Sequence, residues 1–284
     1  MIIPTFNRAT AVSFSVRSVL NQTLTDFEVI VVDDGSTDDT GAVLSAITDP
    51  RLKIIRQPNA ERGAARNKGV SHSCGKYVFF LDSDDELYPD HLQTAYDELS
   101  RLNHPEFFHI RYELKKGDSI IPQEHLDANS VKQKSLKRNR FACQFFLRRD
   151  IATAFPFSEN RDLKIGEDWE IVLKMAVRFP LHFSNECCAA IHQHPKRTME
   201  VASPDEILRS RDILLDNLSE DKMVSRDENI RRNIWSELTS LAALSASLIR
   251  ERRKALSLFF QVLKKRPSSF FSRRTFAILK RIIV

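Results

Sequence analysis

The amino-acid sequence predicts an α/β protein, in which a central, mostly parallel sheet is wound with helices and an all-helical region follows. Three observations support this fold class. Over the first 100 residues, short strand-like runs alternate with longer helix-like segments. The run FEVIVVDD at 27–34 is largely apolar before its two final acids, which is typical of a buried parallel strand. From Ser203 onward, apolar residues recur at helical spacing. We therefore expect one domain at 1–200 and a helical, basic C-terminal region at 201–284.

The period of the apolar residues sets the type of each element in the first 81 residues. A short unbroken apolar run predicts a buried strand, and a spacing of three and four predicts a helix. The elements expected in chain order are a strand stub at 2–3 that breaks at Pro4, a helix at 9–21, a strand at 27–34, a helix from about Thr37, a strand at 52–56, a helix at 61–72 and a strand at 76–81.

Prolines, glycines and charges mark the later elements. Pro89 is expected in the first turn of a helix that runs to about Leu102. Alternating apolar residues at 108–114, followed by KKGD and SIIP, predict a hairpin. Residues 131–140 hold five cations, no acid and little periodicity, which indicates a loop. An amphipathic helix is expected at 167–179.

Composition excludes several classes of protein. The chain has 284 residues, and no apolar run approaches the roughly 20 residues that span a bilayer. The first residues lack the pattern of a signal peptide, and the four cysteines have no disulfide or metal-ligand spacing, so we expect a cytoplasmic protein with reduced thiols. The formal net charge of +5 hides an asymmetry. Residues 250–284 hold eleven Lys and Arg against one acid, a net +10, so the remainder carries −5.

Acids crowd at the end of the strand predicted at 27–34. In VVDDGSTDDT at 31–40, Gly35 allows a tight turn, and the following Ser-Thr pair is expected to cap the next helix. Two acids before the glycine exceed what a turn needs, and open α/β sheets bind ligands at the carboxyl ends of their strands. Asp34 is therefore expected to accept from a nucleobase N–H, while Asp33 orders the loop. Turn and capping chemistry alone is the alternative.

A second acidic cluster follows the strand predicted at 76–81. The stretch YVFFLDSDDELYP places four acids within five positions, and crowded carboxylates repel unless a cation or a set of donors lies among them. An acidic helix cap is the alternative, but a helix that begins at Pro89 starts too far from Asp82, Asp84 and Asp85. Such carboxylates suit a hard divalent cation, Mg²⁺ or Mn²⁺, which completes its shell with water and phosphate oxygens.

Six motifs give the chain a specific resemblance. They are IIPTFNR at 2–8, SVLNQT at 18–23, VVDDGSTDDT at 31–40, GAARNKG at 63–69, FFLDSDDEL at 79–87 and GEDWEI at 166–171. Their order and rough spacing, over about residues 1–195, are similar to those of family 2 glycosyltransferases of the bacterial polysaccharide and glycolipid type. The resemblance implies the GT-A fold, a Rossmann-like fold of nucleotide-diphospho-sugar transferases.

The resemblance also implies roles for single residues. In the D-x-D motif, Asp84 is the expected direct metal ligand, and Asp85 is a further candidate. The residues expected to bind the nucleotide sugar are Pro4, Thr5, Asn7, Asp33, Asp34, Arg66, Asp82 and Ser83.

Two further positions have competing interpretations. Asp168 of GEDWEI matches the family's general base, although acids such as Glu167 and Asp168 are also favoured in the first turn of a helix by its dipole. A histidine after the last core strand sometimes completes the family's metal site, and His194 matches it best. As isolated residues, His192 and His194 are otherwise structural or surface histidines.

The resemblance implies an inverting, metal-dependent glycosyltransferase. Such an enzyme moves a sugar from a nucleotide-diphosphate donor, most commonly a UDP-sugar, to the hydroxyl of a glycan or lipid-linked acceptor. Physical chemistry agrees with two separate acidic sites, because a metal neutralises the departing diphosphate and a carboxylate takes the proton of the attacking hydroxyl. The alternatives are a non-catalytic sugar-nucleotide-binding or membrane-scaffold subunit, and a nucleotidyltransferase. A nucleotidyltransferase ordinarily has a Gly-rich loop after the first strand, whereas this chain has PTFNR there.

The basic C-terminal tail has three possible interpretations. In the tail, cations alternate with apolar residues, as in FAILKRIIV, which allows solvated helix faces, a nucleic-acid patch or a peripheral membrane anchor. The lipid-linked acceptors of the family favour the inner face of the membrane, and no nucleic acid is expected. The basic loop at 131–140 is expected to cover the diphosphate, to meet an anionic acceptor or to be solvated.

Overall fold

The structure is a computed structural model that describes residues 1–122, 125–127, 130–139, 141–195, 197 and 201–283. It divides into two compact units that alternate along the chain. The first unit comprises Met1–Lys132, Phe141–Glu159 and Arg178–His194, and the second comprises Gln133–Arg140, Asn160–Val177 and Pro195–Val284. Two segments that precede residue 200 therefore belong to the second unit, and the division of the chain at residue 200 stays a prediction.

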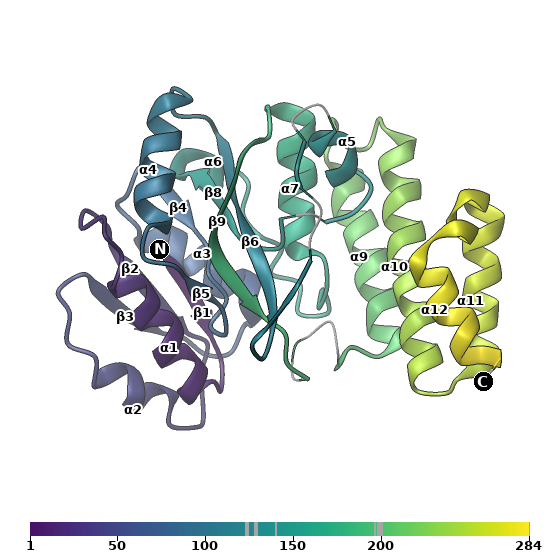
Figure 1. Cartoon of the computed structure of the whole chain (residues 1–284), viewed down its shortest axis with the longest axis horizontal. Helices are drawn as coiled ribbons and strands as arrows, with labels where there is room; N and C mark the ends of the chain where they lie inside the picture. Colours follow the sequence, from purple (N-terminus) through teal and green to yellow (C-terminus); the bar gives the residue numbers. More distant parts are fainter. Residues whose placement is uncertain (123–124, 128–129, 140, 196, 198–200, 284) are drawn as a thin grey trace. The chain divides into compact units, whose positions relative to one another are not determined.

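Three parallel strands in the order β1-β2-β3 form the first sheet (Figure 1). They are β1 (Ile2–Thr5), β2 (Val29–Asp33) and β3 (Leu52–Arg56). β1 and β2 are buried along their whole length, as expected of apolar strands in a parallel sheet. The strand predicted at 52–56 is confirmed, and the one predicted at 27–34 is confirmed with tighter bounds.

The first strand runs through Pro4, so the predicted break at this residue is wrong. Pro4 stays in register with β2. The carbonyl of Thr5 accepts a hydrogen bond from the amide of Asp34, on the β2 side, whereas the carbonyl of Ile2 accepts from the amide of Leu81 on the other side. Because the bonding direction alternates along a strand, Pro4 shares the side of Ile2, and its missing N–H costs no bond to β2.

The second sheet is mixed, with the order β4-β8-β6-β9-β5 and with β7 paired to β6. Its strands are β4 (Tyr77–Phe79), β5 (Glu86–Leu87), β6 (Phe107–Lys116), β7 (Ser119–Ile121), β8 (Phe145–Arg148) and β9 (His182–His192). β6 and β9 run parallel, and the other pairs are antiparallel. A parallel bridge between Ile2 and Phe80 joins the two sheets. β4, β6 and β7 confirm the strand and the hairpin predicted there.

Helices flank these sheets within the first unit. They are α1 (Ala9–Leu20), α2 (Thr40–Ser45), α3 (Glu61–His72), α4 (His91–Arg101) and α6 (Arg149–Ala154). α1 buries Val12, Val16 and Val19, and each fully buried valine contributes about 1.5–3 kcal/mol. α3 approaches β1 so closely that a Cβ on Gly69 would lie 2.4 Å from Cγ2 of Ile2. Only glycine fits this helix against the strand without moving one of them.

Two helices begin later than predicted. α2 begins at Thr40 instead of about Thr37, and its N-cap is Asp39, so the Ser-Thr pair after Gly35 does not cap it. α4 begins at His91, which places Pro89 ahead of its first turn. This later start only lengthens the separation between the helix and the acidic cluster, so the argument against an acidic cap is unchanged.

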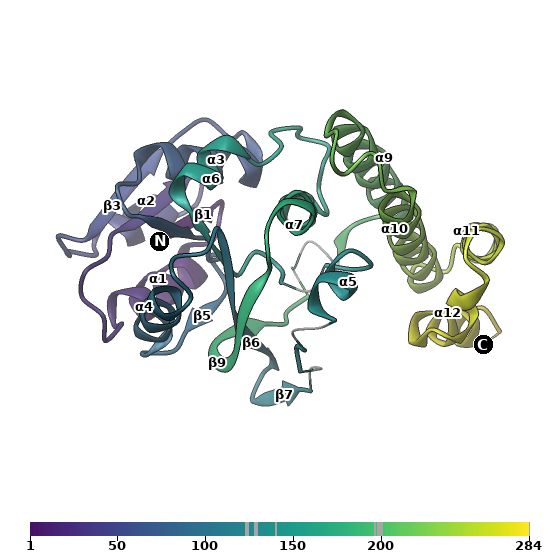
Figure 2. The same ribbon diagram turned by 90° about the horizontal axis from the view of Figure 1, so that it is seen from above.

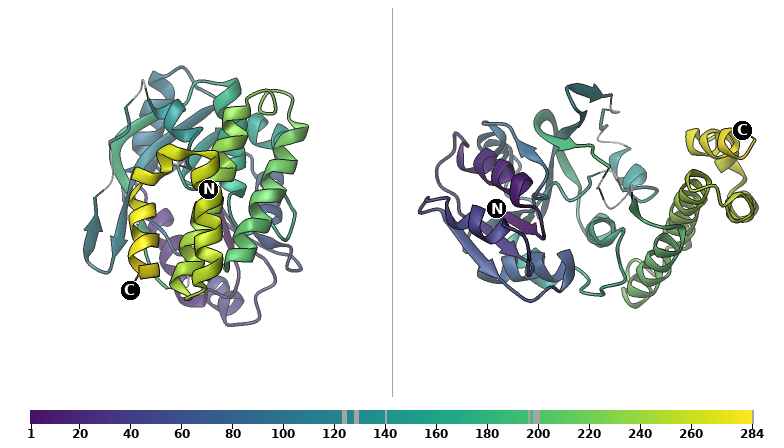
Figure 3. Two further views of the ribbon diagram at one scale, coloured as in Figure 1. Left: turned by 90° about the vertical axis from the view of Figure 1, so that its right-hand side faces the viewer. Right: turned by 90° about the horizontal axis from the view of Figure 1, so that it is seen from below.

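Helices dominate the second unit (Figures 2 and 3). They are α7 (Glu167–Arg178), α9 (Pro204–Glu220), α10 (Glu228–Leu248), α11 (Arg252–Lys265), the 3₁₀ helix η1 (Pro267–Phe271) and α12 (Arg273–Ile283). α10 contacts α9, α11 and α12. Ser203 and Glu206 form a reciprocal capping box at the start of α9. The helices predicted at 167–179 and after Ser203 are thus confirmed.

The loop predicted at 131–140 is wrong in its first half, because α5 (Val131–Ser135) forms a short helix there. Arg140, at the end of that stretch, lies outside the described residues. The four cysteines are free thiols, of which Cys143 and Cys188 are buried. Among the helices that the structure describes, none is long and apolar enough to span a bilayer.

Candidate active site

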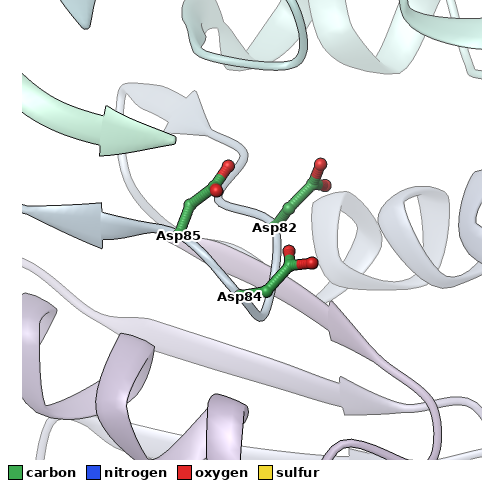
Figure 4. A group of neighbouring side chains, drawn as sticks. All are labelled: Asp82, Asp84 and Asp85. Carbon is green, nitrogen blue, oxygen red and sulfur yellow. The ribbon is translucent and has the colours of Figure 1, made fainter. Parts of the chain in front are cut away.

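The turn after β4 carries three carboxylates on one loop (Figure 4). Asp82, Asp84 and Asp85 each offer an oxygen atom, and these oxygens lie within 4.8 Å of one another. The side chain of Asp82 is 34% exposed and that of Asp84 is 14% exposed, whereas Asp85 is only 1% exposed. Carboxylates so close together repel unless a cation neutralises them, so the turn has the donor chemistry of a divalent-cation site.

Asp85 ties the acidic turn to three other segments of the first unit. Its Oδ1 accepts from the amide of His192 at 3.2 Å, and its Oδ2 accepts from Nε2 of Gln144 at 3.3 Å. The Asp85 carbonyl accepts from Oγ of Ser15 at 2.6 Å. Asp85, a predicted metal candidate, is therefore buried beneath the turn, and α1, β9 and the residue before β8 hold it there.

Asp84 lies between a guanidinium group and an imidazole. Nη1 of Arg8 lies 2.5 Å from Asp84 Oδ2, and Nε2 of His194 lies 2.7 Å from the same oxygen. The structure thus brings the predicted pair Asp84 and His194 together. β9 ends at His192, so His194 lies in the segment that follows the strand. Arg8 is not among the predicted site residues, although its place in the motif PTFNR, three residues after the end of β1, was a signal for it.

Asp82 is paired with the arginine that the resemblance implied. Nη2 of Arg66 donates to Oδ1 of Asp82 at 2.8 Å. The Arg66 side chain is 1% exposed, and its guanidinium lies over the ring of Phe157, 5.1 Å from the centroid. α3 carries this buried cation to the acidic turn, where Ser83 is also buried at 6% exposure. The site therefore holds positive charge of its own beside the three acids.

The ends of β1 and β2 are fastened to each other by Asn7. Its amide donates to Oγ of Ser36 at 2.9 Å, and its Oδ1 accepts from the amide of Thr37 at 2.8 Å. The Asp33 carboxylate accepts from the Ser36 amide at 2.9 Å. Asn7 has a φ of 51°, in the left-handed region that asparagine tolerates better than most residues. With the buried Pro4 and Thr5, these residues gather at the carboxyl end of the parallel sheet.

Asp34 is 3% exposed, and each of its oxygens accepts two hydrogen bonds. Oδ1 accepts from Nε2 of Gln57 and the amide of Ala60, at 2.7 and 2.9 Å. Oδ2 accepts from Nδ2 of Asn59 and the amide of Glu61, at 3.1 and 2.8 Å. This carboxylate thus orders the segment that enters α3, a role that sequence reasoning missed because its partners follow the next strand.

The candidate base lies in the second unit. Asp168 is half-buried in the first turn of α7, whereas its neighbour Glu167 is 4% exposed. Oδ2 of Asp168 accepts from Nδ2 of Asn139 at 2.7 Å, and Oδ1 accepts from the amide of Trp169 at 2.8 Å. Of the two acids that open α7, Asp168 is therefore the more accessible to a substrate.

Comparison with known proteins identifies the family. The family model described as Glycosyl transferase family 2 matches residues 1–157, more than half of the chain. The chain belongs to glycosyl transferase family 2. The matched part contains the acidic turn and the strand ends described above, whereas Asp168 and His194 lie beyond it.

Relatives of this family 2 chain match it over part of their length. An uncharacterized glycosyltransferase of Rickettsia conorii is 44% identical over 176 residues, which cover 59% of this chain and 28% of the relative. The UDP-Glc:alpha-D-GlcNAc-diphosphoundecaprenol beta-1,3-glucosyltransferase WfgD of Escherichia coli is 29% identical over 178 residues, 61% of this chain and 69% of the relative. The chain spans between 19% and 28% of the length of the three Rickettsia relatives that it matches.

Solved structures show the fold of this family 2 chain. The crystal structure of S. aureus TarS 1–349 in complex with UDP-GlcNAc has a TM-score of 0.71 at 20% identity, and covers 99% of this chain and 87% of that one. The mannosyltransferase PcManGT from Pyrobaculum calidifontis, in complex with GDP-Man and Mn²⁺, has a TM-score of 0.59 at 15% identity, with 99% and 84% covered. The predicted GT-A fold with C-terminal helices is thereby confirmed.

Proposed function

We propose that this family 2 chain is an inverting, metal-dependent glycosyltransferase with a nucleotide-diphosphate sugar as donor. The observation that carries the proposal is the turn Asp82–Asp85, which gathers three carboxylates beside two arginines at the strand ends of the first unit. Family membership supports the reaction class. The structural neighbours TarS and PcManGT, in complex with UDP-GlcNAc and GDP-Man, support the donor class, and we favour UDP.

The donor set of the turn fits Mg²⁺ or Mn²⁺, since both prefer carboxylate oxygens. We assign Asp84 and Asp82 as the accessible ligands, and His194 as a further candidate because its Nε2 already meets Asp84. Asp85 would hold the turn in shape because it is buried and both of its oxygens already accept hydrogen bonds. When bound, the cation neutralises the charge that develops on the departing diphosphate.

The residues around the turn then divide the binding of the donor. Arg66 and Arg8 supply fixed positive charge next to the diphosphate, and Arg66 is held rigidly because it is buried. The strand ends with Pro4, Thr5, Asn7 and Asp33 form the nucleoside side of the site. Asp34 shapes that side through the segment that enters α3.

Asp168 is the proposed general base. The proton of the acceptor hydroxyl passes to an oxygen of Asp168 while the hydroxyl oxygen attacks the anomeric carbon of the sugar. The bond from that carbon to the diphosphate oxygen breaks, and its electron pair leaves with the nucleotide diphosphate. A single displacement of this kind inverts the anomeric centre. Positioned general bases contribute about 10²–10⁴-fold to such reactions.

We further propose a glycan or lipid-linked acceptor and contact with the membrane surface. The name of WfgD specifies a diphosphoundecaprenol-linked acceptor. Residues 250–284 carry a net +10, and Phe260 and Phe276 are 62% and 58% exposed. Each Lys or Arg near an anionic bilayer contributes about 1 kcal/mol. The protein should co-sediment with vesicles of phosphatidylcholine and phosphatidylglycerol, and salt should weaken this binding. Equal behaviour with pure phosphatidylcholine vesicles would refute the electrostatic contact.

The test of the catalytic proposal is nucleotide release from a panel of UDP-, GDP- and dTDP-sugars with Mn²⁺, for wild type, Asp84→Ala and Asp168→Asn. Wild type should release the nucleotide, and Asp84→Ala and Asp168→Asn should not. Asp26→Asn, an exposed acid of the first unit, is the matched control and should equal wild type. Binding of a sugar nucleotide without turnover by wild type would favour a non-catalytic binding subunit. Equal turnover by all four proteins would refute the assigned residues.

A further inference from the structure

The loop that follows α5 lies between α7 and the C-terminal helices, all within the second unit. We propose that Asn139 of this loop is a positioning residue for Asp168, and that α10 and α12 hold Asn139 in place. The inference rests on the proposed function, which makes Asp168 the general base. It gives the C-terminal helices a part in catalysis without contact with a substrate.

Asn139 and the backbone amide of Trp169 restrain the Asp168 carboxylate, each at one oxygen. Nδ2 of Asn139 donates to Oδ2 at 2.7 Å, while the amide of Trp169 donates to Oδ1 at 2.8 Å. Two donors on opposite oxygens also fix the rotation of the group, and reactive side chains need such support to stay in a productive orientation.

Two hydrogen bonds to backbone carbonyls fasten the loop before it reaches Asn139. The indole Nε1 of Trp169, a residue that is 2% exposed, donates to the carbonyl of Ser135 at 2.8 Å. Nδ2 of Asn233 on α10, 8% exposed, donates to the carbonyl of Leu136 at 3.3 Å. The loop is therefore attached to α7 on one side and to α10 on the other.

Two ion pairs that share Glu237 extend this attachment to the last helix. Oε1 of Glu237 on α10 accepts from Nε of Arg138 at 2.8 Å and from Nη2 of Arg274 at 2.9 Å. Nη1 of Arg274 on α12 also donates to the Glu237 carbonyl at 3.0 Å. The side chains of Glu237 and Arg274 are each 17% exposed, so solvent screens their pair less than an open surface pair. Arg138 directly precedes Asn139, so these ion pairs restrain the backbone from which the Asn139 side chain extends.

The first experiment is Asn139→Asp, which keeps the shape of the side chain but replaces its donor with a second carboxylate. Turnover of UDP-GlcNAc and UDP-glucose with Mn²⁺ is measured by nucleotide release. We expect kcat to fall by about tenfold to a hundredfold, as for other residues that orient a reactive group, with the donor KM unchanged. Gln133→Ala, at an exposed position before the same loop, is the control and should equal wild type. A kcat within twofold of wild type, or an equal loss of donor binding, would overturn the role.

The second experiment is a double-mutant cycle between Asn139→Ala and Glu237→Gln. If α10 acts through Asn139, Glu237→Gln lowers kcat several-fold in the wild-type background and has no further effect in Asn139→Ala. Glu228→Gln, an exposed acid in the first turn of the same helix, is the matched control. Effects that multiply independently would show that the helices do not act through Asn139.

Hydrogen–deuterium exchange separates this inference from the proposed function. In Glu237→Gln the amides of residues 133–139 should exchange faster than in wild type, and in Glu228→Gln they should not. Unchanged exchange would overturn the anchoring by α10 and α12, whatever the activity. If Asp168→Asn abolishes turnover while Asn139→Asp does not, the positioning role alone fails. If wild type turns over no donor of the panel, the proposed function fails and the role of Asn139 in catalysis fails with it.

Discussion

Nε2 of His194 lies 2.7 Å from Oδ2 of Asp84, although strands and helices of both units separate them in sequence. The pairing of β5 with β9 explains the contact. Glu86, next to the acidic turn, is opposite Ala190 in antiparallel register, so the chain that leaves β9 passes the turn. A two-residue strand therefore brings an imidazole to a carboxylate.

His194→Ala is expected to weaken Mn²⁺ binding. The loss of an imidazole that ligates the cation or orients its carboxylate ligand lowers metal affinity by about 10–100-fold. Isothermal titration of Mn²⁺ in the presence of UDP measures the change. His192→Ala is the control, since Nε2 of His192 lies 3.3 Å from Glu86 instead. Equal Mn²⁺ affinity in both variants would remove His194 from the site.

Asp84→Asn and Asp85→Asn are expected to fail in different ways. Asp85 is buried, and both of its oxygens accept hydrogen bonds. In Asp85→Asn, the NH₂ group of the new side chain would point at one of these donors, which should lower the free energy of unfolding by about 1–3 kcal/mol. Asp84 is more exposed, and its amide should mainly abolish Mn²⁺ binding. Urea unfolding of both variants, together with the Mn²⁺ titration, checks the difference. The reverse pattern would make Asp85 the ligand and Asp84 the support.

Asp34→Ala is expected to destabilise the first unit. The change removes the carboxylate to which the half-buried backbone amides of Ala60 and Glu61 donate, and each hydrogen bond lost there costs about 1–2 kcal/mol. Urea unfolding should therefore show a loss of about 2–4 kcal/mol. Asp26→Ala, at an exposed position, is the control and should lose under about 0.5 kcal/mol. A stability equal to that of the control would mean that Asp34 serves the ligand alone.

The fold is expected to lose stability in acid because two imidazoles are buried. Burial lowers the pKa of His91 to about 3 and that of His109 to about 4. The unfolded chain, with a histidine pKa of about 6.5, binds these protons first, so the stabilisation is complete above pH ~6.5 and is lost as the pH falls towards 3–4. Each group should remove about 2 kcal/mol between pH 7 and pH 5.

His91→Phe tests this origin of the acid sensitivity. His91 packs against Phe79 and Phe146, and the Cys188 carbonyl that it contacts also accepts from the backbone amide of Tyr88. A phenyl ring in place of His91 therefore leaves that carbonyl with a hydrogen-bond donor. Urea unfolding of the variant should lose about 2 kcal/mol less than wild type between pH 7 and pH 5, whereas the exposed His72→Gln should follow wild type. Parallel pH curves for His91→Phe and wild type would contradict the assignment.

Much of the fold follows from local patterns. The strand at 52–56 and the helix at 61–72 have the bounds that apolar spacing predicts. The order of the second sheet was not predictable from such patterns, because β8 is four residues long and finds its partners only through long-range pairing. The first strand shows the same limit: whether a proline breaks a strand depends on which side its nitrogen faces.

The site divides in a similar way. The three acids after β4 were predictable because charge directly follows a buried strand. Gln144 and Asn139 come from segments whose own residues look ordinary, and only the packing of other elements brings them to the acids. The partners of Asp34 were hidden for the same reason, since they follow β3 and not β2.

The central claim is that the turn Asp82–Asp85 holds a divalent cation against the diphosphate of the donor. The most direct measurement is a crystal structure with UDP and Mn²⁺, in which anomalous difference density locates the manganese. We expect one manganese peak coordinated by Asp84, with UDP phosphate oxygens in the same coordination shell. UDP bound at the strand ends with no manganese at Asp82, Asp84 or Asp85 would contradict it.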